Sequence, residues 1–169
     1  MKKIVIMMTM CFLSRSIFAQ WKVETIDDGF DKYKQAWVMT SDKDARLDLI
    51  PYKGKVVLAI ETPLINYSNT KNNVEISFKI KGEKRTYNVT GYASKSSSMV
   101  YFTKKDSNFD DMDLLSSESF LADFKSATAL KVKIVYSKLY DTDYKWEEYV
   151  FNMTGSTKAY NSIANQKNE

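Results

Sequence analysis

The residues of this chain best suited to chemistry form an acidic segment at residues 106–113. Its candidates for holding a cation are Asp106, Asn108, Asp110, Asp111 and Asp113. The first three have the spacing of the first three ligands of a calcium-binding loop. The position that should be Gly is Asp111, and the twelfth position, which should be a bidentate Glu, is Ser117. We therefore expect a solvated acidic loop and no resident metal or cofactor, with these five residues as a weak metal candidate.

Other catalytic groups are scarce, because the chain has one Cys and no His. The Ser-His-Asp and Cys-His mechanisms and His-ligated metals are thereby excluded. Carboxylates could pair at Asp141 and Asp143 or at Glu147 and Glu148, as a glycan hydrolase would need across a cleft. Adjacent residues on a strand point to opposite faces, so Glu147 and Glu148 cannot pair directly. Residues 94–98 combine Ser and Lys but are typical of a loop. We predict a protein that is not an enzyme, with a carboxylate-dependent glycan hydrolase as the catalytic alternative.

Aromatic side chains are numerous, with 11 Tyr and 3 Trp. Rigid rings bury a large area at a small cost in conformational entropy, and they therefore suit binding surfaces. The rings that we expect near turns or strand ends, as candidates for contacting a partner, belong to Tyr67, Tyr92, Tyr140, Tyr144 and Trp146. Ordinary core packing is the alternative for each of them.

The first 19 residues have the layout of a secretory signal. Lys2 and Lys3 precede an apolar run at residues 4–13, and Ala19 offers a small residue for cleavage. The run is about ten residues long, whereas roughly 20 are needed to span a bilayer. We expect residues 1–19 to be removed and the mature chain, without a transmembrane segment, to be exported to the bacterial periplasm or beyond the cell.

Removal of this segment changes the composition of the chain. Lys2, Lys3 and Arg15 leave with it, so that 25 basic residues fall to 22 against 21 acidic residues, a net charge of +1. Cys11, the single cysteine, leaves as well, and the mature chain is then free of cysteine. A nearly neutral exported protein gives little support for a nucleic-acid partner.

An alternation of period two dominates the mature chain and predicts β-strands. In residues 73–80, for example, every second side chain is apolar, which predicts one buried and one solvated face. The predicted strands are residues 21–26, 33–40, 45–51, 56–62, 73–80, 85–92, 98–104, 130–140 and 146–154. The first of them is expected at an edge of the sheet. Turn residues such as Gly29, Gly54 and Gly82 separate these runs.

One helix is predicted at residues 117–127, where a Ser can cap the first turn. Its apolar stripe, which we expect to cover the core, consists of Phe120, Leu121, Phe124 and Ala127. We predict a mainly β fold, a single-domain antiparallel β-sandwich of about eight or nine strands with one helix near the C-terminal half. The domain spans residues 20–160, and residues 161–169 form a polar tail that could begin with a short helical turn.

The layout also resembles a known family. A secretion signal precedes a first strand that opens Trp21-Lys22-Val23, and the helix carries Phe120-Leu121-Ala122-Asp123-Phe124-Lys125-Ser126-Ala127. The strand Leu130-Lys131-Val132-Lys133-Ile134 and the segment Phe151-Asn152-Met153-Thr154-Gly155-Ser156-Thr157-Lys158-Ala159 follow. This order resembles the periplasmic invasion-associated locus B family and related small exported β-sandwich domains. The resemblance implies a non-catalytic sandwich and supplies no site residues.

Three functions are compatible with these features. The first is an exported binding protein whose partner is another protein or an envelope component, for instance an immunity or inhibitor protein that blocks a toxin or hydrolase. The second is a structural or assembly subunit of a secretion or surface apparatus, which predicts an exposed edge strand. The third is the glycan hydrolase, which predicts two carboxyl groups converging in a pocket.

Overall fold

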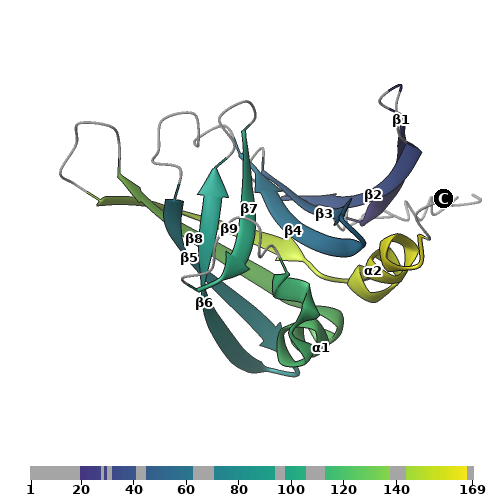
Figure 1. The fold of residues 1–169 in the computed structure, drawn as a ribbon. Coiled ribbons are helices and arrows are strands. Elements are labelled where there is room, and N and C mark those ends of the chain that lie inside the picture. The colour runs from purple at the N-terminus through teal and green to yellow at the C-terminus, as the bar shows by residue number, and fades with distance from the viewer. Residues whose placement is uncertain are drawn as a thin grey trace, which may run out of the picture.

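The described part of the chain forms one antiparallel sheet and two α-helices (Figure 1). The computed structural model describes residues 20–27, 29, 32–40, 45–62, 71–93, 98–105, 113–137 and 144–166. Its strands are β1 (Lys22–Asp27), β2 (Lys32–Met39), β3 (Arg46–Tyr52), β4 (Lys55–Glu61), β5 (Lys71–Ile80), β6 (Glu83–Ala93), β7 (Met99–Lys104), β8 (Ala129–Ser137) and β9 (Tyr144–Asn152). Its helical elements are the 3₁₀ turn η3 (Leu114–Ser116), α1 (Glu118–Ser126) and α2 (Ser156–Ala164). The mainly antiparallel β class is therefore confirmed, and each predicted strand overlaps one of these nine.

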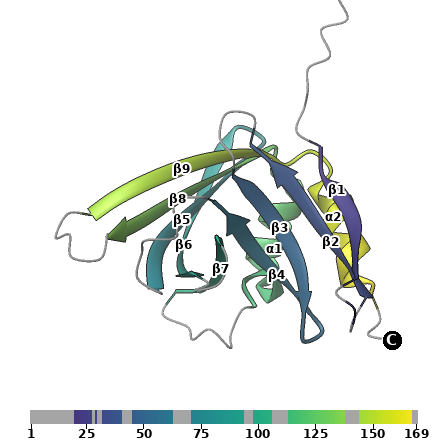
Figure 2. The same cartoon turned by 90° about the horizontal axis from the view of Figure 1, so that it is seen from above.

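The strands follow the order β1-β2-β3-β4-β7-β6-β5-β8-β9, and each neighbouring pair is antiparallel. The first strand lies at one edge, as the sequence predicts, and β9 lies at the other. The described strands form one continuous sheet where the sequence suggested two packed sheets. The sheet is strongly curved (Figure 2). Its curvature brings β9 close to the end of β4, where the Thr62 and Tyr149 hydroxyls form a 2.6 Å hydrogen bond.

The core lies on the inner face of this curved sheet, under α1. The strand alternation directs the largest apolar side chains inward, and Phe78 of β5 is fully buried. The Phe120 ring meets the Phe78 ring edge-on with centroids 5.1 Å apart, and Phe124 does so at 6.4 Å. Trp21 packs edge-on against Phe124 at 6.0 Å. The predicted apolar stripe therefore covers the core, with Leu121 partly buried at its margin.

A buried carboxylate fixes α1 to the sheet. Asp123 accepts hydrogen bonds from Arg85 Nη1 at 2.8 Å and from the Tyr87 hydroxyl at 2.7 Å, both on β6. A carboxylate that leaves water is stabilised only if charged and polar partners replace the solvent. These two bonds therefore set both the position and the rotation of α1 on the sheet.

A second helix, α2, continues past residue 160, so that the folded region extends beyond the expected boundary with the tail. Its inward side buries Ala159 and Ile163. Beyond its end, the Gln166 carboxamide accepts from the Lys34 N–H at 2.7 Å and donates to the Lys34 carbonyl at 2.9 Å. The β2–β3 register, continued by two residues, would place Pro51 opposite Lys34, and proline has no N–H to donate. Gln166 thus satisfies backbone groups of β2 and ties α2 to the sheet.

Candidate functional site

The most exposed apolar side chains of the described residues lie along β9. Tyr144 is 75% exposed, Trp146 58% and Val150 55%. Alternation places these three on the outer face of the strand, while Tyr149 and Phe151 point into the core. Water-exposed apolar groups that lie together are typical of a contact surface. We call these three residues, with the neighbouring Lys131, Lys133 and Glu148, the β9 surface.

Two lysines of β8 support this surface. Lys133 Nζ lies 5.0 Å from the centroid of the Trp146 ring, which is within the range of a cation–π contact. Lys131 Nζ lies 2.6 Å from Glu148 Oε1. In the register, Lys133 faces Glu148 and Lys131 faces Val150, so that each lysine leans diagonally across the pair of strands. Lys133 therefore lies over the Trp146 ring, and Lys131 forms an ion pair beside it on the same face.

The structure describes three of the five aromatic residues that were predicted to contact a partner. Tyr144 and Trp146 lie together on β9, and both are exposed. Tyr92 is half-buried on β6, where it faces Tyr101 of β7, and β5 and β8 separate it from β9. Tyr67 and Tyr140 lie outside the described residues. Sequence reasoning missed Val150 as a contact candidate. Val150 lies four residues after Trp146, and the strand alternation therefore places both side chains on the same face.

The acidic segment contributes one described residue, Asp113. Its carboxylate accepts from the Ser116 hydroxyl at 2.9 Å and lies 3.4 Å from Lys104 Nζ. Burial acts to raise the pKa of Asp113, but the Ser116 hydrogen bond and the Lys104 charge outweigh it and hold that pKa below its usual 3.8. The remaining candidates, which are Asp106, Asn108, Asp110 and Asp111, lie outside the described residues. Across the described ranges, no three metal-ligating side chains of His, Cys, Asp or Glu converge.

The paired carboxylates of the sequence are not brought together where the structure describes them. Glu148 lies on the outer face of β9 with Lys131, whereas Glu147 follows the inward parity of Tyr149. Asp141, Asp143 and residues 94–97 lie outside the described ranges.

A different carboxylate, Asp48 of β3, is the most deeply buried acid of the described residues. It is fully buried. Gln35 Nε2 donates a hydrogen bond to it, and Arg46 Nε lies 3.0 Å from its carboxylate. Arg46 Nη2 also binds Glu61 Oε2 at 3.0 Å, and the guanidinium lies 5.6 Å from the Trp37 ring centroid. One arginine therefore joins two carboxylates on neighbouring strands, β3 and β4, while Gln35 brings in β2.

Burial raises the pKa of Asp48 from its ordinary 3.8 to about 6, although Arg46 and the Gln35 hydrogen bond act to lower it. Alternation within β3 predicts that Asp48 faces water, because Leu47 and Leu49 point inward. The structure buries it because Gln35 and Arg46 cover it from the same face. Asp48 can therefore change its charge near neutral pH. In the structure, the cluster connects the three strands β2, β3 and β4.

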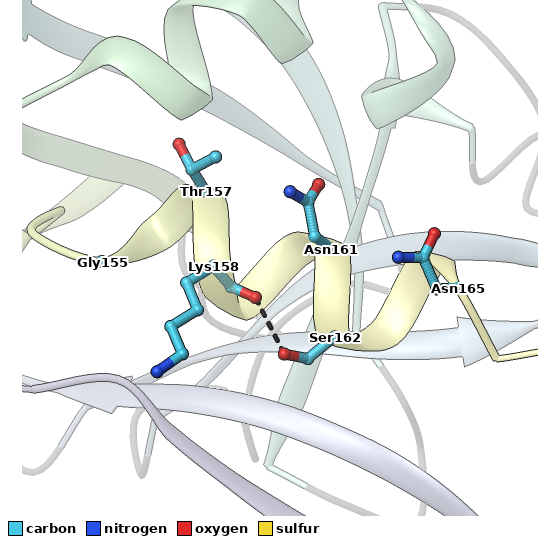
Figure 3. Close-up of a pocket in the computed structure, with 6 residues that line it drawn as sticks. All are labelled: Gly155, Thr157, Lys158, Asn161, Ser162 and Asn165. Carbon is cyan, nitrogen blue, oxygen red and sulfur yellow. Dashed lines mark hydrogen bonds between the residues drawn. The ribbon is translucent and has the colours of Figure 1, made fainter.

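A shallow depression lies on α2 (Figure 3). It is lined by Gly155, Thr157, Lys158, Asn161, Ser162 and Asn165. All six come from one helix and its two flanking residues, and the Ser162 hydroxyl donates to the Lys158 carbonyl at 2.9 Å. A single helix surface cannot surround a small molecule, so the β9 surface is the stronger candidate for a binding site.

Comparison with models of known protein families, with curated proteins and with solved structures gave no match. The resemblance to the invasion-associated locus B family therefore stays a prediction. In the described part of the chain, no helix has the length and apolar character required to cross a membrane.

Proposed function

We propose that this chain is an exported, non-catalytic binding protein that holds another protein on its β9 surface. The observation that carries the proposal is the exposure of Tyr144, Trp146 and Val150 on one face of an edge strand. The signal-like residues 1–19 support export, and the periplasm is the compartment that they favour.

The composition of the β9 surface matches that of a protein interface. Aromatic rings are enriched at the centre of such interfaces, whereas charged groups lie at the rim. Here Tyr144 and Trp146 supply the rings, and the Lys131–Glu148 ion pair supplies a rim whose charges are already balanced. A partner can therefore cover this part of the rim while the Lys131–Glu148 pair stays intact, which avoids the cost of burying either charge alone.

The proposal includes the more specific case of an immunity or inhibitor protein. In that case the protein bound on the β9 surface is a toxin or a hydrolase, and the complex blocks its active site. The sequence has one Cys and no His, and this scarcity of catalytic groups is consistent with a protein that acts by binding and does not catalyse a reaction.

Affinity capture from the envelope fraction of the source bacterium tests the proposal, with three baits compared side by side. The wild-type chain and Val23→Ala should retain the same partner, since Val23 is an exposed apolar residue on β1, at the opposite edge. Trp146→Ala should lose it, because truncation of a central aromatic anchor costs about 2 kcal/mol or more. Equal retention of every protein by all three baits would contradict the proposal.

A further inference from the structure

The hairpin formed by β5 and β6 carries exposed positive charges at its turn. Lys79, Lys81 and Lys84 lie in the turn or beside it, and all three are exposed. Figure 1 shows this hairpin reaching the lower end of the molecule next to α1. A Cβ atom at Gly82 would meet no atom within 4 Å beyond its own chain neighbours, so the turn is open to its surroundings. We call these three residues the hairpin lysines.

Strand alternation separates the hairpin lysines from the acidic residue of the same segment. Phe78 is buried, so Lys79 beside it points to the outer face, and Lys84 points the same way from β6. Glu83 shares the opposite face with Arg85, whose guanidinium forms an ion pair with α1 at 2.8 Å. The ion pairs among the described residues do not include any of the hairpin lysines.

The pairing of β5 with β6 sets two of these lysines directly against each other. Lys79 is the register partner of Lys84, and on its other side it faces the uncharged Ala129 of β8. The next row on the outer face consists of Ser77 and Thr86, whose hydroxyls form a 3.1 Å hydrogen bond. Like charges directly opposite each other destabilise a pair of strands. The outer face therefore holds a like-charge pair that no carboxylate of β5 or β6 in these two rows relieves.

Lys81 occupies a turn position that favours other types of residue. Its φ is 46° and that of the following Gly82 is 89°, so both residues are in the left-handed region. Gly, Asn and Asp are the residues preferred there in a two-residue hairpin turn. The hairpin thus carries lysines where neither the ladder nor the turn favours them, and what the three positions share is positive charge.

We propose that the hairpin lysines dock this protein on an anionic phospholipid surface. A layer of phosphate headgroups presents many negative charges at once, so it can meet three separate lysines without a pocket. Ile80, the apolar residue beside the turn, is buried, and the contact is therefore electrostatic and reversible. Each lysine near such a surface strengthens binding about fivefold at low ionic strength. The contact is separate from the β9 surface, and it holds whether or not that surface binds another protein.

Co-sedimentation with vesicles tests the docking. Wild-type protein should bind vesicles of equal parts phosphatidylglycerol and phosphatidylcholine more tightly than vesicles of phosphatidylcholine alone. Added salt should release it, because salt screens exposed charges. Lys81→Asn should weaken binding to the anionic vesicles about fivefold. Residues 1–19 are the same in every variant, so differences between variants report the hairpin.

Lys53→Asn is the matched control for Lys81→Asn. Lys53 precedes Gly54 in the turn between β3 and β4 with a φ of 47°, so its replacement removes the same charge from the same kind of turn position. Its Nζ lies 5.1 Å from the centroid of the Tyr52 ring, at a different hairpin. The control should bind anionic vesicles as the wild type does.

Lys84→Glu gives a second signature. Binding to anionic vesicles should fall about 25-fold, since one positive charge is lost and one negative charge is gained. The midpoint of thermal unfolding should rise in the same variant, because the new carboxylate would face Lys79 as an opposite charge. Lys84→Arg keeps the charge and should bind as the wild type does. Equal binding of the wild type to both kinds of vesicle, unchanged binding of Lys84→Glu, or an equal loss in Lys53→Asn and Lys81→Asn would overturn the docking.

Discussion

Replacement of Asp48 by Asn should change how the stability of the fold depends on pH. Asp48 is fully buried, and its pKa is raised from 3.8 to about 6 by burial. A raised carboxyl pKa means that the folded state resists ionisation more than the unfolded chain does. The group therefore stabilises the fold fully below the unfolded pKa near 4, and this contribution is lost as the pH rises toward 6.

The size of the effect follows from the shift. One pKa unit corresponds to 1.36 kcal/mol, so that ionisation of Asp48 costs the folded state about 3 kcal/mol at neutral pH. Asn has the same shape as a protonated Asp and does not ionise. The free energy of unfolding of Asp48→Asn, relative to wild type, should therefore rise by about 2 kcal/mol between pH 4 and pH 7, since the unfolded carboxyl is already partly ionised at pH 4.

Urea unfolding followed by Trp fluorescence at a series of pH values measures this difference. Asp113→Asn provides a control of opposite sign, because the pKa of Asp113 is lowered and its carboxylate stabilises the fold at neutral pH. The relative stability of Asp113→Asn should fall as the pH rises through the range where wild-type Asp113 ionises. A difference between wild type and Asp48→Asn that stays constant from pH 4 to pH 7 would refute the reasoning.

Two further substitutions test the attachment of the helices. Asp123→Ala should lower the free energy of unfolding by about 2–3 kcal/mol, since it removes the partner of Arg85 and Tyr87 under α1; urea denaturation measures it, and a change below about 0.5 kcal/mol would contradict this role. Gln166→Ala should cost about 1 kcal/mol and increase amide hydrogen exchange at Lys34, whose backbone loses both bonds; unchanged exchange there would show that Gln166 does not protect β2.

The strands were predictable because each one alternates between the core and solvent. Residues 73–80 illustrate this, since Val74, Ile76 and Phe78 are all buried. The path of the sheet was not predictable from the same pattern. The pairings of β4 with β7 and of β5 with β8 join strands far apart in sequence, and local periodicity has no information about such partners. A single curved sheet and two packed sheets therefore give the same alternation.

The second helix escaped prediction because α2 has few apolar residues. Its inward side is built by Ala159 and Ile163 with the small polar Ser156, which donates to the Phe124 carbonyl at 3.1 Å. A buried polar residue whose hydrogen bond is formed within the protein, as that of Ser156 is, does not contribute to an apolar pattern in the sequence.

The candidate site was predictable in part. Tyr144 and Trp146 were chosen as contact candidates because the sequence places them near a turn or strand end, and both are exposed in the structure. The burial of Asp48 was not, because it results from Gln35 of a neighbouring strand and from Arg46, and not from the period of β3 itself. The burial of a polar residue on an outer face depends on which side chains of the neighbouring strands cover it. Strand pairing determines those neighbours, and the local sequence does not.

The affinity of the captured partner for the Trp146→Ala variant tests the central claim most directly. Isothermal titration of the purified partner into wild type, Val23→Ala and Trp146→Ala gives three dissociation constants under one set of conditions. The β9 surface predicts equal values for wild type and Val23→Ala and a value about 30-fold weaker or more for Trp146→Ala. A Trp146→Ala chain that is folded and binds the partner as tightly as wild type would contradict it.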